Sequence, residues 1–436
     1  MGMRRFTFLP WDIYSWKTAF AWSGTSGLAM LALLLAEFLQ LQDTNAPGMH
    51  ASNATIWLIR APLTFAAALL LLSRPYFPKL TLRDLRLWFL VYAGYFALSL
   101  AWSTAHLQTA GKAFELMIGT LIILQASRDQ HALRRLEGLY RMTLLLFSLM
   151  ALITVLGYFA RIESFTAQRA GIFTQTTAES SFYSSNGLGY MAIAFILVAF
   201  AEFVLGGAKL SKALPQLSYA LFIFLFAGSR TAFAILALGV VAVLLRRHKA
   251  ALIAFLLCAA PAGVYLAPRL IKRLNRGQSQ AGLDTLSGRT VMWTAAFRDW
   301  EKHPLLGYGG GVGGKHALSS VWGGSLSNMS HLHDGFLECL TGLGIFGFLL
   351  ACAILVVATW RVARLWKKYP SFAGLYIWII SIWITNIMSN GVMSGMNDVV
   401  VIYLILLAHV DIVRRGVPGA VDAPRRPALM YNGAME

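Results

Sequence analysis

HLHDGFLECLTGLGIFGFLLACAILVVAT, residues 331–359, begins with two histidines and an aspartate and continues as a long apolar run. The run over 335–359 is long enough to cross a bilayer, which takes roughly 17–25 helical residues. The rest of the chain has the same character, because 57% of its 436 residues are hydrophobic, 13% are charged and the mean hydropathy is +0.61. This composition excludes an ordinary soluble domain and predicts an integral membrane protein.

Twelve apolar runs of bilayer length are predicted to be transmembrane helices. They cover 18–41, 55–73, 87–104, 110–127, 140–160, 187–206, 213–228, 231–246, 250–268, 335–359, 372–389 and 397–413. The fourth and eighth runs are the weakest, because the fourth contains Lys112 and Glu115 and the eighth is short. The predicted fold class is therefore an all-α polytopic membrane protein with one long loop.

Basic residues determine the predicted sidedness of these helices. The net charge of +18 comes from short Lys and Arg clusters that recur in every second loop, as membrane topology signals do, so nucleic acid is excluded as a partner. The positive-inside rule then predicts cytoplasmic termini, and a long loop crosses largely regardless of its charge. The predicted organisation is helices one to nine in 1–268, a periplasmic loop with an amphipathic helix in 269–334, helices ten to twelve in 335–413, and a cytoplasmic tail in 414–436.

Arg230 stands at an expected helix start on the outer side, after Ser229 in FLFAGSRTAFAILAL. A cation at the positive end of a helix dipole costs roughly 0.3–1 kcal/mol unless an anion lies beside it. With an anion present, the guanidinium and the free backbone N–H groups bind it together. Arg230 is therefore interpreted as an anion ligand, with an arginine snorkelling to the membrane interface as the alternative.

The long loop repeats this arrangement in LSGRTVMWTAAFRDWEKH, where Arg289 lies in the first turn of a predicted helix. The spacing puts Arg289 on one stripe with Trp293, Phe297 and Trp300. Such a helix is expected to rest on the bilayer surface and aim Arg289 inward, although an aromatic interface helix with an incidental arginine is the alternative. Two arginines at helix starts on one side predict a phosphate clamp.

The polar residues before the tenth run are candidates for proton transfer. His331 and His333 alternate as in an extended stretch, so their side chains are expected to point the same way. A neutral histidine near pH 7 can act as a general base, and a satisfied structural histidine is the alternative. Glu338 can hold His333 from one turn away or pair with an outer arginine. Asp334 completes this group, and His331, Asp334 and Glu338 are expected to bind the substrates.

Further outer residues are expected to help bind an anionic lipid substrate: Arg60, Arg161 and Arg169. GYGGGVGGKH, residues 307–316, nearly matches a P-loop but has His316 where Ser or Thr is required, so it is interpreted as a flexible glycine loop beside the site. No ligand spacing is diagnostic of a metal, and no cofactor is expected.

The order of these motifs is familiar: SRTA at a helix start, R-x-x-x-W leading to HPLLGYGGG, and then HDGFLECLTGLGIFG. It resembles the O-antigen ligase and polymerase superfamily, and the single long outer loop between late helices is most similar to O-antigen ligases. By this resemblance His333, followed by Leu337, is catalytic together with Arg230 and Arg289. The R-x-G-x-F element and its later asparagine fall on Arg169 and Asn186. Many relatives have asparagine at the position of Asp334, which leaves open whether Asp334 binds sugar hydroxyls or tunes the pKa of His333.

The resemblance implies a GT-C-like glycosyltransferase in the bacterial inner membrane, with a periplasmic active site. The reaction would move a glycan from undecaprenyl pyrophosphate to a sugar hydroxyl of lipid A–core oligosaccharide, and both lipids would be partners. The residues are compatible with it, since a pyrophosphate leaving group needs cations and helix N-termini rather than a nucleotide site. Direct displacement would invert the anomeric carbon. An O-antigen polymerase and an anionic-lipid transporter are the alternatives.

Overall fold

A computed structural model of the chain describes residues 9–38, 53–73, 78–167, 177–178, 185–227, 229–247, 253, 289–322, 331–389 and 391–416. Within these residues the protein is helical, apart from a two-residue antiparallel pair in which Thr166 faces Ala178. The ninth predicted run, apart from residue 253, and Arg169 lie outside the described residues.

The helices have the following bounds: α1 Ile13–Phe38, α2 Asn53–Leu72, α3 Leu85–Leu98, α4 His106–Ala126, α5 Ala132–Phe159, α6 Ser185–Val204, α7 Leu210–Phe226, α8 Arg230–Arg247, α11 Arg289–Trp300, α12 Gly313–Trp322, α13 Gly335–Lys368, α14 Ala373–Tyr376, α15 Trp378–Met388 and α16 Asp398–Arg414. The strands are β1 Thr166–Ala167 and β2 Thr177–Ala178, and short 3₁₀ turns lie at Ser99–Ala101, Glu163–Phe165 and Pro370–Phe372.

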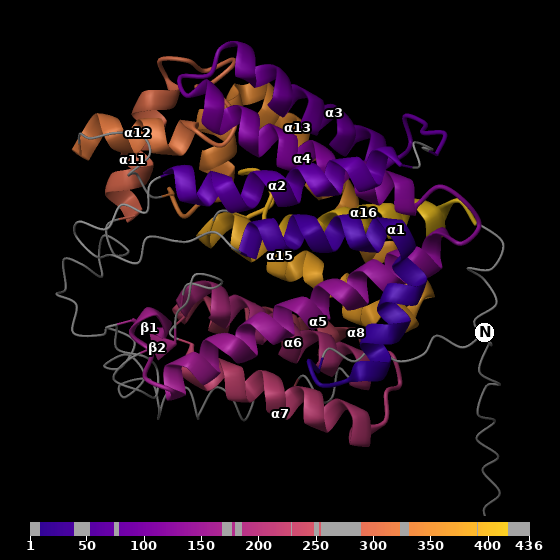
Figure 1. Cartoon of the computed structure of the whole chain (residues 1–436). Coiled ribbons are helices and arrows are strands. Elements are labelled where there is room, and N and C mark those ends of the chain that lie inside the picture. Colours follow the sequence, from indigo (N-terminus) through magenta and orange to yellow (C-terminus); the bar gives the residue numbers. More distant parts are fainter. Residues whose placement is uncertain are drawn as a thin grey trace, which may run out of the picture.

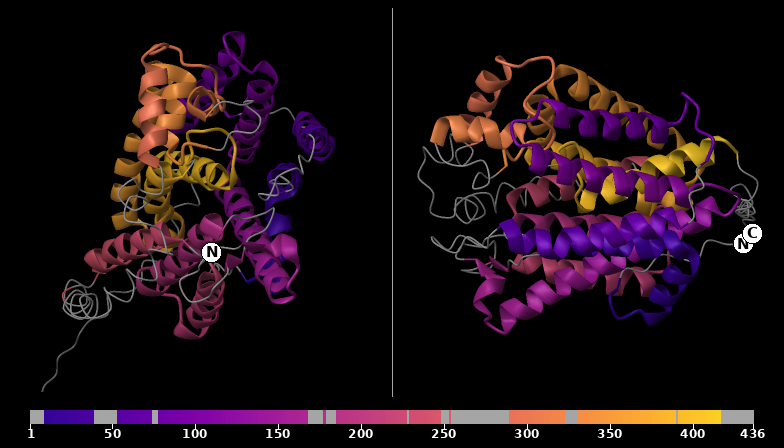
Figure 2. Two further views of the ribbon diagram at one scale, coloured as in Figure 1. Left: turned by 90° about the vertical axis from the view of Figure 1, so that its left-hand side faces the viewer. Right: turned by 45° about the horizontal axis from the view of Figure 1, so that its top comes forward.

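Every predicted run except the ninth coincides with a helix or a pair of helices, including the two weak ones, which form α4 and α8. Five helices are long and apolar enough to cross a membrane by themselves: α1, α4, α5, α6 and α13. The all-helical membrane class is therefore confirmed, while the count of twelve stays a prediction. The long helices lie side by side along one direction, with α11, α12, β1 and β2 at one end of the bundle (Figures 1 and 2).

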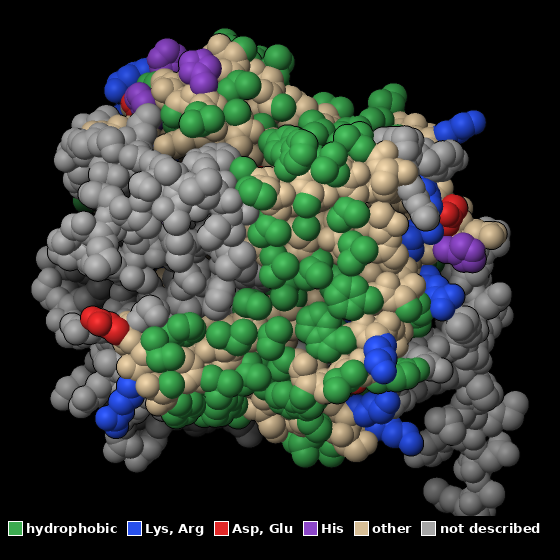
Figure 3. Space-filling view, viewed as in Figure 1, with side chains coloured by type: hydrophobic (Ala, Val, Ile, Leu, Met, Phe, Trp, Pro, Cys, Tyr) green, Lys and Arg blue, Asp and Glu red, His purple; other side chains and the backbone are tan. Residues whose placement is uncertain are grey.

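The surface of the bundle fits a lipid environment. Figure 3 shows hydrophobic side chains across the middle of one face, with charged side chains toward its edges. On α13, Phe346, Leu349 and Val356 are each more than half exposed although they are large and apolar. In water such a surface is an interaction site, whereas lipid tails cover it in a membrane.

The α13 helix is broken at Gly344, whose φ of 63° and ψ of −168° are not helical. A break leaves backbone carbonyls without helical partners, and these must be bonded elsewhere. The glycine loop supplies the donors, since the Tyr308 N–H bonds the Thr341 carbonyl at 2.9 Å and the Gly309 N–H bonds the Gly342 carbonyl at 2.8 Å. A Cβ at Gly344 would lie 2.1 Å from the Leu305 carbonyl oxygen, so this close approach requires glycine.

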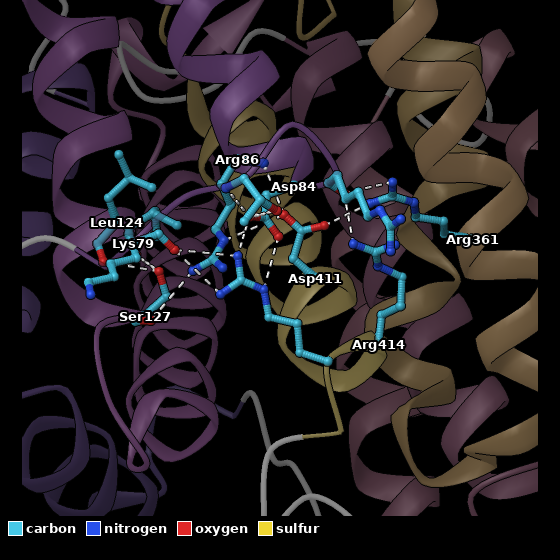
Figure 4. Close-up of polar contacts among 12 residues, drawn as sticks. Lys79, Asp84, Arg86, Leu124, Ser127, Arg361, Asp411 and Arg414 are labelled. Atoms are coloured by element: carbon cyan, nitrogen blue, oxygen red, sulfur yellow. Dashed lines mark hydrogen bonds and ion pairs between the residues drawn. The ribbon is translucent and has the colours of Figure 1, made fainter.

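At the opposite end of the bundle, a buried ion network joins α3, α13 and α16 (Figure 4). The fully buried Asp411 carboxylate accepts the Arg86 backbone N–H at 3.0 Å and the Arg361 guanidinium at 2.8 Å. Asp84, also fully buried, pairs with Arg415. Because these carboxylates have cationic and backbone donors, they are compatible with burial and fix the three helix ends together.

Replacing Gly344 by alanine should destabilise the protein by at least about 1–3 kcal/mol, because alanine is strained at this φ and its Cβ meets Leu305. The matched control is Gly94→Ala in α3, where a Cβ meets nothing within 4 Å. Thermal unfolding in detergent should separate the two variants. Equal melting temperatures for both would contradict the role of the Gly344 break.

Candidate active site

The histidine turn, residues 331–334, caps α13. Asp334 is the N-cap, and its side chain accepts the Leu337 N–H at 2.9 Å. His333 is half-buried and has a φ of 54°, in the left-handed region that few residues other than glycine adopt. The extended alternation expected for His331 and His333 is therefore wrong, because the turn into the N-cap requires the left-handed residue.

The Glu338 side chain contacts the histidine turn through hydrogen bonding. Its side chain is buried at 3% exposure, and Oε1 accepts the Leu332 N–H at 2.7 Å and lies 3.8 Å from Nδ1 of His331. Gly314 at the start of α12 packs against the same carboxylate, where a Cβ would lie 2.4 Å from Oε2. Of the partners that sequence left open for Glu338, the structure brings it to backbone N–H groups and to His331.

Helix α11 is bonded to the histidine turn. Trp293 donates its indole N–H to the Leu332 carbonyl at 3.0 Å, and Arg289, one turn earlier, places its guanidinium 3.7 Å from the Met388 sulfur. Burial raises the pKa of Asp334, while the Leu337 and Phe336 amides and the charge of Arg289 oppose the rise. The charge of Arg289 therefore reaches the residue next to His333.

The buried face of α11 differs from the predicted aromatic stripe. Met292, Ala296 and Asp299 are its most buried face, whereas Phe297 is 47% exposed. Trp293 and Trp300 lie at the edge of this face and hydrogen-bond carbonyls, so the small residues allow the close approach to α12 and α13. That the aromatic stripe rests on a bilayer stays a prediction, and in the structure its two tryptophans also have backbone hydrogen-bond partners.

Two lysines that sequence reasoning did not assign to the site lie beside the histidine turn. Their charges act on His331: its desolvation and the charges of Lys315 and Lys112 lower the pKa of His331, so this ring is neutral at pH 7. Lys315 belongs to α12, and burial followed by the charge of Lys112 lowers its pKa too. Two sequence signals could have indicated these residues: Lys112 is a charged residue within an apolar run, and Lys315 follows directly after glycines.

A second polar group ties α11 to α12. Asp299 is 1% exposed, and its Oδ2 lies 2.6 Å from Nδ1 of His316. Tyr308 stacks on the His316 ring at 3.9 Å and donates its hydroxyl to Asp299 at 3.2 Å. His316, which departed from the P-loop pattern, thus has a structural partner.

The glycine loop itself is fixed rather than flexible, which corrects the expectation from its composition. Gly307, Gly309 and Gly311 have φ values of 67°, 109° and 72°, and the Gly310 N–H bonds Ser99 Oγ at 2.9 Å. Helix α12 begins within this stretch, at Gly313, so the last four residues of the stretch are helical. Positive φ angles explain the glycines, and bonds to α13 and to Ser99 fix the loop.

Arg60 reaches a buried carboxylate. Its guanidinium lies 2.5 Å from Glu115 of α4, and both residues line a 510 Å³ pocket between α2 and α4. Lys112 lies 3.8 Å from the other oxygen of Glu115. Arg60 therefore has a buried counterion in this structure.

The remaining predicted residues lie at the same end of the bundle as α11. Arg230 is the first residue of α8, as predicted, and the Ala232 N–H bonds the Ser229 hydroxyl at 3.3 Å as an N-cap. Asn186 is half-buried in the first turn of α6, and Arg161 is exposed after α5 with a φ of 56°. Arg169 lies outside the described residues.

Residues 217–352 match the O-antigen ligase family model. Over these residues the chain is similar to O-antigen ligases. The match covers less than half of the chain, yet it includes Arg230, Arg289, the histidine turn and Glu338. The resemblance to the O-antigen ligase and polymerase superfamily is thus confirmed, and the domain is of a glycosyltransferase-like class. A search of curated proteins found no match.

The described part of the ligase domain and its surroundings holds no group of three or more His, Cys, Asp or Glu placed to bind a metal. Metal independence itself stays a prediction, which a chelator tests.

Acidification should loosen α11 from α12. Burial alone would raise the pKa of Asp299, but bonds from His316 and Lys302 outweigh it and lower the pKa. A carboxylate with a lowered folded pKa stabilises the fold above its unfolded pKa and loses this contribution as pH falls through the folded value. The protection of α11 amides, measured as hydrogen exchange relative to the intrinsic rate, should therefore fall below about pH 4.

The control for this experiment is Asp299→Asn, which cannot titrate. Its α11 exchange, corrected for intrinsic chemistry, should be faster than wild type at pH 7 and flat on acidification. A wild-type profile equally flat would refute the role of Asp299.

Proposed function

We propose that this protein transfers a glycan from undecaprenyl pyrophosphate to a sugar hydroxyl of lipid A–core oligosaccharide, at the periplasmic face of the bacterial inner membrane. The reaction is a direct, inverting displacement without metal, with His333 as general base and Arg230 and Arg289 on the pyrophosphate. The O-antigen ligase domain supports the class of reaction.

One observation carries the assignment of roles. The Trp293 indole bonds the carbonyl of Leu332, the residue before His333, so α11 carries Arg289 to the histidine turn across a long separation in sequence. This contact supports the proposed pairing of His333 as base with Arg289 as cation, since transfer between two bound substrates requires both groups close together.

Charge develops on the pyrophosphate as the glycosidic bond breaks. Preorganised cations and helix N-termini stabilise such a charge without reorganisation. Arg230 and Arg289 each begin a helix at this end of the bundle, and the charges of Lys112 and Lys315 add to the field. Asn186, Arg161, Arg169, His331 and Arg60 are proposed to contact the substrates, and Arg60 would have to exchange its partner Glu115 for a substrate anion.

The acceptor hydroxyl loses its proton as it attacks the anomeric carbon. His333 occupies a strained left-handed position, and such strain persists at sites where the surrounding structure over-determines it. Asp334 and Glu338 hold the turn on both sides of His333, so they position the base rather than contact the reacting atoms.

A polymerase of the same superfamily would use the same donor with a lipid-linked glycan as acceptor. Reconstitution with both acceptors decides, because product on lipid A–core alone is expected of the ligase. A transporter of anionic lipid is favoured by one observation, since Arg141, Glu202 and His409 are buried ionisable residues toward the opposite end of the spans. Product formation in detergent, where nothing needs to cross a bilayer, excludes transport as the sole activity.

His333→Ala should lower the rate of glycan transfer by about 100- to 10,000-fold, the usual contribution of a general base, with donor binding retained. The assay is transfer between purified lipid substrates, with and without EDTA. His106→Ala, an exposed histidine at the same end, is the control and should be fully active. Unchanged transfer by His333→Ala would show that His333 is not the general base. Loss of wild-type activity in EDTA would show that the reaction depends on a metal.

Arg289→Gln should lower transfer by roughly 100- to 1,000-fold, because one charge-stabilising donor to the leaving group is lost. Arg298→Gln is the matched control, since Arg298 is an exposed arginine on the same helix. Single-turnover kinetics with saturating donor should locate the loss in the chemical step. If both variants lose activity equally, the effect comes from the positive charge of α11 as a whole and not from a specific contact of Arg289 with the leaving group.

A further inference from the structure

A polar cavity lies at the end of the bundle opposite the candidate active site. It has a volume of about 340 Å³ and is formed where α1 meets the turn between α4 and α5. Its wall includes Trp22, Arg128, His131, Arg134 and Arg135, and no carboxylate lines it. A cavity of this size is at the small end of the range that holds ligands.

The cavity exists because α1 is broken. Gly24 has a φ of 58° and a ψ of −141°, and a second helical segment restarts after it. Thr25 and Ser26, the first residues of that segment, line the cavity. A helix start presents backbone N–H groups that favour an anion.

The floor of the cavity is built from buried polar groups. Ser26 donates its hydroxyl to the Gln125 side chain at 3.1 Å, and Gln125 donates to the Leu71 carbonyl at 3.2 Å. Both side chains are at most 5% exposed. These bonds hold the break of α1 against α4, so the cavity has a defined shape.

The cations exceed the local negative charge. Asp129 lies 2.7 Å from Arg135 and 3.6 Å from Arg128. Arg134 places its guanidinium over the Trp22 ring at 5.2 Å. Its charge also acts on Glu137, which pairs with Arg141 at 2.9 Å. Two carboxylates therefore face four guanidinium groups around this cavity, which leaves an excess of positive charge for an anionic ligand.

We propose that this cavity binds a phosphate group, with Arg128 and Arg134 as its cationic ligands and the restarted segment of α1 as its amide donor. Guanidinium groups match phosphate oxygens in geometry as well as charge. The phosphate comes from an anionic phospholipid headgroup or from free phosphate in the adjoining water, and the site is independent of the proposed glycan transfer.

The test uses the full-length protein in neutral detergent. Native mass spectrometry measures retention of phosphatidylglycerol against phosphatidylcholine, and thermal unfolding measures stabilisation by inorganic phosphate against chloride at equal ionic strength. The test variant is Arg128→Gln with Arg134→Gln. The matched control is Arg364→Gln with Lys367→Gln on α13, because Arg364 also stacks on an indole, that of Trp360, at 3.7 Å.

The double variant should bind at least tenfold more weakly than wild type and control, since each charge-assisted bond contributes about a factor of ten. Loss confined to phosphatidylglycerol identifies a lipid headgroup, and loss of saturable stabilisation by inorganic phosphate identifies free phosphate. Arg128→Lys with Arg134→Lys should recover part of the binding, which a merely misfolded variant would not. Equal binding by the double variant and wild type, or no preference of wild type for either phosphate source, overturns the proposal.

Discussion

The break of α13 at Gly344 is the constraint from which the candidate active site follows. A continuous helix of 34 residues would extend about 50 Å, well beyond the roughly 30 Å of a hydrocarbon core. The break divides it into residues 345–368, which alone can span a bilayer, and residues 335–343, which carry Glu338 and follow Asp334. The carbonyls left free at the break accept the Tyr308 and Gly309 amides. The glycine loop and the histidine turn are thereby fixed to the same helix.

Three polar contacts then join α11, α12 and the histidine turn around the start of α13. Glu338 joins the histidine turn to Gly314 of α12, Trp293 joins α11 to the turn, and Asp299 joins α11 to His316 of α12. Each contact uses a buried donor or acceptor, so opening one leaves a polar group unsatisfied. The position of Arg289 relative to His333 is thus determined by several bonds at once, which is the preorganisation that charge stabilisation in a transition state requires.

The sequence could predict the helices because apolar length is a local signal, and it could predict the start of α8 because Ser229 and Arg230 are adjacent. It could not predict the break at Gly344, because a glycine in an apolar helix gives no local sign of the loop amides that satisfy it. The left-handed φ of His333 could not be predicted from the sequence for the same reason, because it depends on the contacts that Glu338 and Asp334 make on both sides of the turn. Lys112 and Lys315 belong to different helices, so only the fold shows that their charges meet at His331.

The distribution of charge also separates the cations that can take a pyrophosphate from those that already have counterions. Arg60 lies 2.5 Å from Glu115, and an anion competing for it would have to displace a buried carboxylate. Lys315 is in the opposite situation, because burial and the like charge of Lys112 lower its pKa. In the proposed mechanism, a diphosphate beside these lysines would offset the repulsion between their charges. Transfer of the glycan turns the pyrophosphate diester of the donor into a monoester with more negative charge, so cations at this site would bind the leaving group more strongly than the donor, as stabilisation of the departing charge requires.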